Sequence, residues 1–125
     1  MTIVVAVDAE AAVRAWATGL NIRAALAPLR SGAAYLLLSR AGGTQDTPGV
    51  DHARITAIGH GSTKQQAANV ALAFANAVWN LTPGVIADGV FCLGAEVESG
   101  PTELADPSGV SRYLVVASFE LGPTR

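Results

Sequence analysis

The chain of 125 residues is half apolar, only 14% charged, and carries a formal net charge of −2 with a single cysteine. This length predicts one domain, spanning residues 1–125, that buries about two-thirds of the surface of its unfolded chain. The eight Lys and Arg residues are scattered, which argues against a nucleic-acid binder that works through a basic patch. A lone cysteine excludes an intrachain disulfide and a CxxC site.

The first third of the chain predicts a helix and then a strand. Residues 1–7 are mostly apolar but lack a basic flank and end at Asp8, so we expect neither a signal peptide nor a membrane span, and a protein that is cytosolic when made. Asp8 is a suitable N-cap for a helix over residues 9–18. Residues 21–32 show no period and predict a connecting segment. The apolar run over residues 33–40 predicts a strand covered on both faces, or a buried helix of the same length.

The middle of the chain predicts a second strand and a longer helix. Residues 41–49 are rich in glycine and polar residues and predict a loop. Alternating apolar residues over 51–60 predict a strand. Ser62 and Gln65 have the spacing of a capping box. Apolar residues at helical spacing then continue for about five turns, until Thr82-Pro-Gly84 ends the helix.

The last third predicts two strands around a long loop. Residues 90–98 alternate, with Phe91, Leu93, Ala95 and Val97 on one face and Cys92, Glu96 and Glu98 on the other. Residues 113–121 alternate in the same way. The loop over 99–111 contains two prolines and is far longer than the roughly 2–5 residues of an ordinary hairpin. Loops of this length are usually functional or disordered. Cys92 is interpreted as a small buried hydrophobic residue.

The order of these elements predicts the fold class. A helix, two strands, a second helix and two further strands give an α+β domain. Strands that follow one another across loops pair antiparallel, so we expect a mixed or antiparallel four-stranded sheet with the helices packed on one face. Few charges on such a small domain have two explanations: an alanine-rich composition and surface that is buried in an assembly.

The sequence predicts no catalytic, cofactor-binding or metal-ligating residue. His52 and His60 stand eight residues apart without a third ligand, which is not a metal-binding pattern. The Gly59-His-Gly-Ser-Thr run could hold a phosphate at a helix N-terminus, but it lacks the spacing of a P-loop or a dinucleotide-binding turn. A glycine-flanked turn is the simpler interpretation. Ser62 has no identifiable pair of base and carboxylate to activate it.

Acidic residues are concentrated around the last predicted hairpin. Glu96, Glu98, Glu103 and Asp106 stand there without a matching run of Lys or Arg. They are either a solvated strand end, a charged surface for a partner, or a surface that repels a passing polyanion. A catalytic pair of carboxylates would need a convergent pocket, which one hairpin does not supply.

The arrangement resembles the tail terminator proteins of long-tailed, siphovirus-like bacteriophages. The likeness lies in the N-terminal helix, the hairpin over residues 35–58, and the Gly-Ser/Thr turn into a long alanine-rich helix. It is strongest at the end of the chain, where a valine-rich strand and a proline-containing loop precede Arg112-Tyr113 and an apolar strand. The family often has an aromatic residue before the glycine that opens the long helix, and this chain has His60 there.

The resemblance implies a structural virion protein and no cofactor. Tail terminators form a ring, here expected to be a homohexamer, at the head-proximal end of the tail. The ring ends polymerisation of the major tail tube protein and offers a joining surface to the head-completion or stopper protein. DNA would pass through the lumen without specific binding, and assembly would take place in the host cytoplasm without a membrane. Residues expected to contact partners or to line the lumen are Thr44, Gln45, Asp46, Glu96, Glu98, Glu103, Asp106 and Arg112.

Two alternatives stay open at this point. The chain could be another component of the head–tail joint, such as a stopper or an adaptor. It could also be a small oligomeric enzyme whose site forms between subunits, with His60 and a carboxylate from a neighbour.

Overall fold

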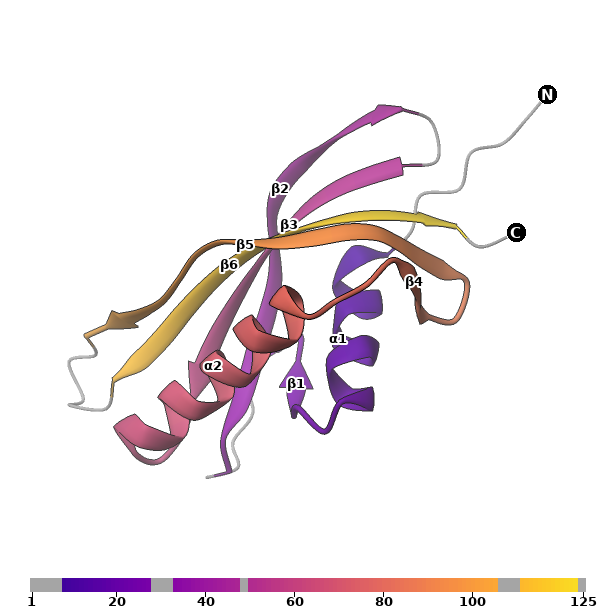
Figure 1. Cartoon of the computed structure of the whole chain (residues 1–125). Helices are drawn as coiled ribbons and strands as arrows, with labels where there is room; N and C mark the ends of the chain where they lie inside the picture. Colours follow the sequence, from indigo (N-terminus) through magenta and orange to yellow (C-terminus); the bar gives the residue numbers. More distant parts are fainter. Residues whose placement is uncertain (1–7, 28–32, 48–49, 106–110, 124–125) are drawn as a thin grey trace.

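The computed structural model describes residues 8–27, 33–47, 50–105 and 111–123. Within these residues the helices and strands form one layer of helices against one sheet (Figure 1). The sheet has the strand order β1-β2-β3-β6-β5-β4. In chain order the elements are α1 (Ala9–Gly19), β1 (Ala24–Ala25), β2 (Tyr35–Thr47), β3 (Val50–His60), α2 (Lys64–Trp79), β4 (Gly84–Ala87), β5 (Val90–Leu104) and β6 (Arg112–Pro123).

The predicted α+β class is confirmed, whereas the predicted number of strands is wrong. The described residues form six strands, of which β2, β3, β6 and β5 are the expected antiparallel set. Strand β1 pairs with β2 in parallel, and β4 pairs with β5 in antiparallel fashion. These outer strands have two and four residues, which is too short for a period to be visible in the sequence.

Two predicted loops are strand in part. Strand β2 continues to Thr47 and β5 to Leu104, so each hairpin is much longer than the sequence indicated. Glycines with positive φ make this possible: Gly43 has φ 114° and Gly100 has φ 97°. A Cβ at Gly43 would lie 1.9 Å from the carbonyl oxygen of His52, and the register shifts between Arg40 and Gly43. The glycines therefore form β-bulges inside continuing strands.

Both helices begin at a capping residue as the sequence predicted, but the N-cap of α2 lies one residue later than expected. The side chain of Asp8 accepts a hydrogen bond from the backbone N–H of Ala11, which confirms it as the N-cap of α1. Helix α2 is capped by Thr63, which accepts from the N–H of Gln66, and not by Ser62. The sequence offers two adjacent hydroxyl residues and two adjacent glutamines, so both frames satisfy the same capping pattern.

Helices α1 and α2 cover one face of the sheet (Figure 1). The register places the alternate residues Ala53, Ile55 and Ala57 of β3 on that face. Their partners on β6 are also buried, and Phe119 packs edge-on against Trp16 of α1, with ring centroids 5.8 Å apart. Between Cys92 and Gly94 a bulge breaks the alternation expected for β5, so that Cys92 faces the core and Leu93 is exposed.

Candidate interaction surface: the open face of the sheet

The face of the sheet opposite the helices is polar and hollowed. A hollow of about 550 Å³ is lined by residues of β2, β3, β6 and β5. Its lining includes Gly43, His52, Arg54, Glu96, Ser118 and Glu120. The side chains come from alternate strand positions, because residues that face away from the helices recur every second residue along a strand. This surface is here called the open face.

On the open face an ion pair joins β3 to β5 across β6. The guanidinium of Arg54 on β3 donates to both carboxylate oxygens of Glu98 on β5, at 2.7 and 3.1 Å. The Arg54 side chain and, to a smaller degree, Ser118 hold the pKa of Glu98 below its usual value. On the same face His52 Nδ1 lies 3.6 Å from a carboxylate oxygen of Glu120. The hydroxyl of Ser118 interacts with the carboxylate of Glu98 and not with a histidine base, which is not the arrangement of an activated nucleophile.

The structure separates the acidic residues that the sequence grouped. Glu96 and Glu98 lie on the open face, whereas Glu103 points to the helix side, where Lys64 lies 2.9 Å from its carboxylate. The hydroxyl of Tyr113 also donates to Glu103, at 3.1 Å. Register shifts between Val97 and Thr102 move the later residues of β5 to other faces. Spacing alone could not predict this division.

The positions of the remaining predicted contact residues follow from the strands to which they belong. Thr44, Gln45 and Asp46 lie in the last part of β2, next to the turn into β3. Arg112 begins β6, opposite Leu104 on β5. Asp106 lies outside the described residues. The described members of the predicted set therefore lie near the turns of the two long hairpins, except Glu96 and Glu98, which lie within β5.

The junction between β3 and α2 is a packing site. The ring of His60 stacks on Tyr35, with centroids 4.9 Å apart and planes 8° from parallel. The hydroxyl of Ser62 donates to the side chain of Gln66 at 2.8 Å. A Cβ at Gly59 would lie 2.5 Å from the carbonyl oxygen of Ala67. This glycine is needed for the close approach of helix and strand, which supports the interpretation as a glycine-flanked turn.

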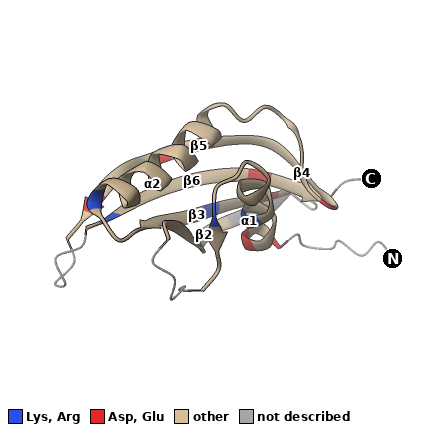
Figure 2. Cartoon of the chain, turned by 90° about the horizontal axis from the view of Figure 1, so that it is seen from below, with Lys and Arg blue, Asp and Glu red and all other residues tan. Residues whose placement is uncertain are grey.

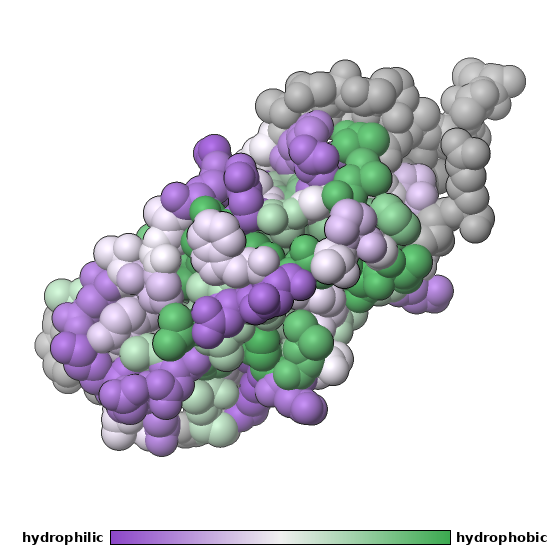
Figure 3. All heavy atoms as spheres, in the orientation of Figure 1, coloured by the Kyte–Doolittle hydropathy of each residue, from purple (hydrophilic) through white to green (hydrophobic). Residues whose placement is uncertain are grey.

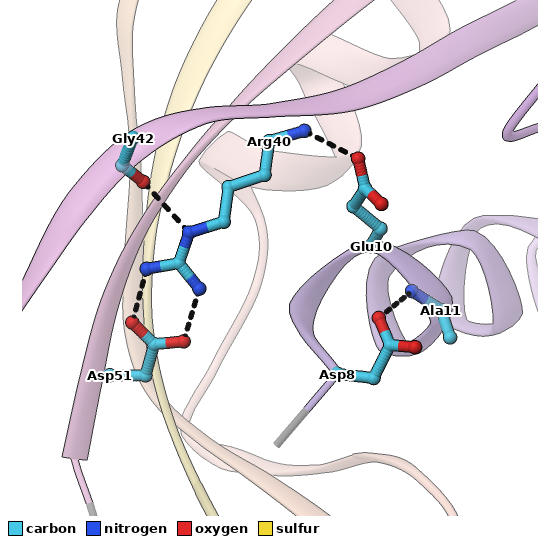
Figure 4. Close-up of polar contacts among 6 residues, drawn as sticks. All are labelled: Asp8, Glu10, Ala11, Arg40, Gly42 and Asp51. Atoms are coloured by element: carbon cyan, nitrogen blue, oxygen red, sulfur yellow. Dashed lines mark hydrogen bonds and ion pairs between the residues drawn. The ribbon is translucent and has the colours of Figure 1, made fainter. Parts of the chain in front are cut away.

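A network at the edge of β2 was missed by sequence reasoning. The guanidinium of Arg40 donates to both carboxylate oxygens of Asp51, at 2.5 and 2.6 Å (Figure 4). Asp51 is 7% exposed, and this hydrogen bond raises the pKa of Arg40. The backbone N–H of Arg40 donates to the Glu10 carboxylate of α1 at 2.8 Å. The pair is eleven residues apart across a bulged hairpin, so no sequence period indicates it.

Few charges are visible elsewhere on the described chain (Figure 2). Apolar residues reach the surface in patches between hydrophilic ones (Figure 3), and Trp79 and Val85 are 68% and 64% exposed. Among the described residues no three His, Cys, Asp or Glu side chains are grouped so that they could hold a metal ion. None of the helices within the described ranges is long and apolar enough to cross a membrane.

Comparisons with known proteins add nothing to this picture. No protein-family model, no curated protein and no solved structure matches the chain. The likeness to tail terminators consequently stays a prediction from the sequence.

Proposed function

We propose that the chain is a ring-forming structural protein that caps the tail tube of a long-tailed bacteriophage, as tail terminators do. It would end polymerisation of the tube protein and offer a docking surface to the head-completion or stopper protein. DNA would pass through the lumen of the ring without being bound. The sequence resemblance suggests this role, and the surface of the described chain supports it.

The observation that carries the proposal is that the sheet is covered on one side only. Helices α1 and α2 close one face, and the open face lies at the other. Beyond Cys92 no described strand pairs with the outer edge of β5. A ring requires two different patches on each subunit, one at either end. An open face and an unpaired strand edge at one end of the sheet provide one such patch.

The described polar groups favour binding over catalysis. Hydroxyl, imidazole and carboxylate groups are present on the open face, but Ser118 is bound to Glu98 and His52 faces Glu120. His60, the residue invoked for an enzyme between subunits, is stacked on Tyr35. These groups are engaged in contacts that hold the sheet together.

The test is the assembly state of the purified chain and its effect on tube growth. Native mass spectrometry and electron microscopy should show a closed ring, and adding the ring to growing tubes should stop elongation at one end. A chain that stays monomeric at high concentration, with tube protein added, would overturn the proposal. Rings that leave tube growth unchanged but bind the portal side of the joint would identify a stopper or an adaptor instead.

A further inference from the structure

Most charged side chains of the described residues have a partner within the subunit. Among the charged residues whose side chains the structure describes, three have no hydrogen-bond or ion-pair partner in the described ranges: the base Arg14 and the acids Asp88 and Glu96. All three are exposed. Because the chain has few charges, these residues are the ones available to form ion pairs with another molecule.

Arg14 lies on the exposed side of α1, next to the flank that contacts β2. Residues four apart share one side of a helix, and Glu10, four residues before Arg14, contacts the backbone of Arg40 on β2 (Figure 4). The buried residues of α1, among them Val13 and Trp16, point to the core instead. Arg14 is therefore an exposed base on the helix side of the sheet.

Glu96 lies on the open face, on the other side of the sheet from the helices. It is opposite Ser118 on β6 and lines the hollow of about 550 Å³. The hollow is also lined by the carboxylate of Glu120 and by the guanidinium of Arg54. Since Arg54 is already bound to Glu98, the surplus negative charge is centred on Glu96 and Glu120.

We infer that the hollow over Glu96 receives the α1 flank of a second copy of this chain, and that Arg14 of that copy forms an ion pair with Glu96. The two groups have opposite charge and lie on different patches. Each subunit can therefore bind one neighbour through Arg14 and the other neighbour through Glu96. This is the geometry of a head-to-tail ring. The inference rests on the proposed function for the ring and adds which surfaces form its subunit contact.

The shape of β5 explains why side chains rather than a continued sheet would define this contact. Its pairing with β6 shifts register three times between Cys92 and Thr102. Bulges of this kind prevent a regular ladder with a further strand and so protect an open edge from indiscriminate pairing. Specific recognition then depends on the charges and on the fit of the hollow.

Charge reversal tests the contact. Glu96→Arg and Arg14→Glu should each weaken self-association on the order of tenfold or more, because each sets like charges against one another. The double variant should restore most of the affinity, as measured by sedimentation or native mass spectrometry across a dilution series. Asp88→Arg is the matched control: it changes the net charge equally but lies eight residues away along the chain, in the turn between β4 and β5, and should leave association unchanged.

Cross-linking gives an independent readout. Glu96→Cys mixed with Arg14→Cys should yield a covalent dimer with a short thiol cross-linker, whereas each variant alone should not. The native Cys92 is buried, so the unaltered chain should not react. Rings that persist unchanged in Glu96→Arg, with no cross-linking, would overturn this contact and leave the proposed function standing. A monomeric unaltered chain would remove both.

Discussion

The two faces of one sheet meet different demands in this protein. The face under α1 and α2 is filled by apolar side chains, and Phe119, Ile55 and Ala117 are fully buried there. The open face carries ion pairs and a hollow, although its residues alternate with the buried ones on the same strands. Neighbouring residues of one strand therefore have different roles: one side chain packs in the core and stabilises the fold, and the next lies on the open face and is available for interaction.

The largest expected effect lies on the covered face. Phe119→Ala removes a fully buried ring that packs against Trp16 and Phe74, so we expect a loss of about 3–5 kcal/mol in unfolding free energy. Urea unfolding followed by circular dichroism measures it. The matched change on the open face is Val116→Ala, three residues earlier on the same strand, and should cost much less. Equal losses at the two positions would contradict the division between the faces.

The next effect compares the ion pair at the β2 edge with that on the open face. Asp51→Ala leaves the guanidinium of Arg40 without its main partner beside the core, and hydrogen bonds to charged groups contribute about 1.5–3 kcal/mol. Glu98→Ala breaks a pair that faces solvent, so its effect on unfolding free energy should be smaller. A double-mutant cycle of Arg40→Ala with Asp51→Ala isolates the coupling. A larger loss for the solvent-facing pair would reverse our ranking.

Two glycines, one under α2 and one on the open face, allow the same comparison between the covered face and the open face. Gly59→Ala places a methyl group 2.5 Å from the carbonyl oxygen of Ala67 and should destabilise by about 1–3 kcal/mol, because helix and strand must move apart. Gly94→Ala meets no atom within 4 Å on the open face and should change the unfolding free energy by less than about 0.5 kcal/mol. Thermal unfolding of both variants measures the difference. Similar midpoints would show that α2 does not hold its close approach to β3.

The parts of the fold that sequence could predict are those with a period. Alternation on β3 and β6 indicated the covered face, and Asp8 indicated the start of α1. The outer strands could not be predicted, since Ala24–Ala25 and Gly84–Ala87 are too short and acquire strand geometry only by pairing with β2 and β5. Tertiary pairing overrides weak local preference at such positions.

The candidate site was predictable only as a list of residues. Glu96 and Glu98 were recognised as acids on one strand face, but their separation from Glu103 depends on bulges whose position is set by glycine geometry and cross-strand contacts. The partner of Glu98 is Arg54, forty-four residues away. Side-chain partners at that separation follow from strand register, which one sequence does not specify.

The smallest expected effect is the dependence of stability on pH at the open face. The Arg54 guanidinium lowers the pKa of Glu98 in the folded chain. The unfolded chain therefore binds the proton more readily, and the stabilisation is complete above the ordinary pKa of about 4.3 and is lost as the pH falls through the lowered value. We expect Glu98→Gln to reduce the slope of unfolding free energy against pH below this point, measured by urea titrations at a dilution where the chain is monomeric. Identical slopes for Glu98→Gln and the unaltered chain would show that the Arg54 pair does not form in solution, and the open face would then lack the ion pair that joins β3 to β5.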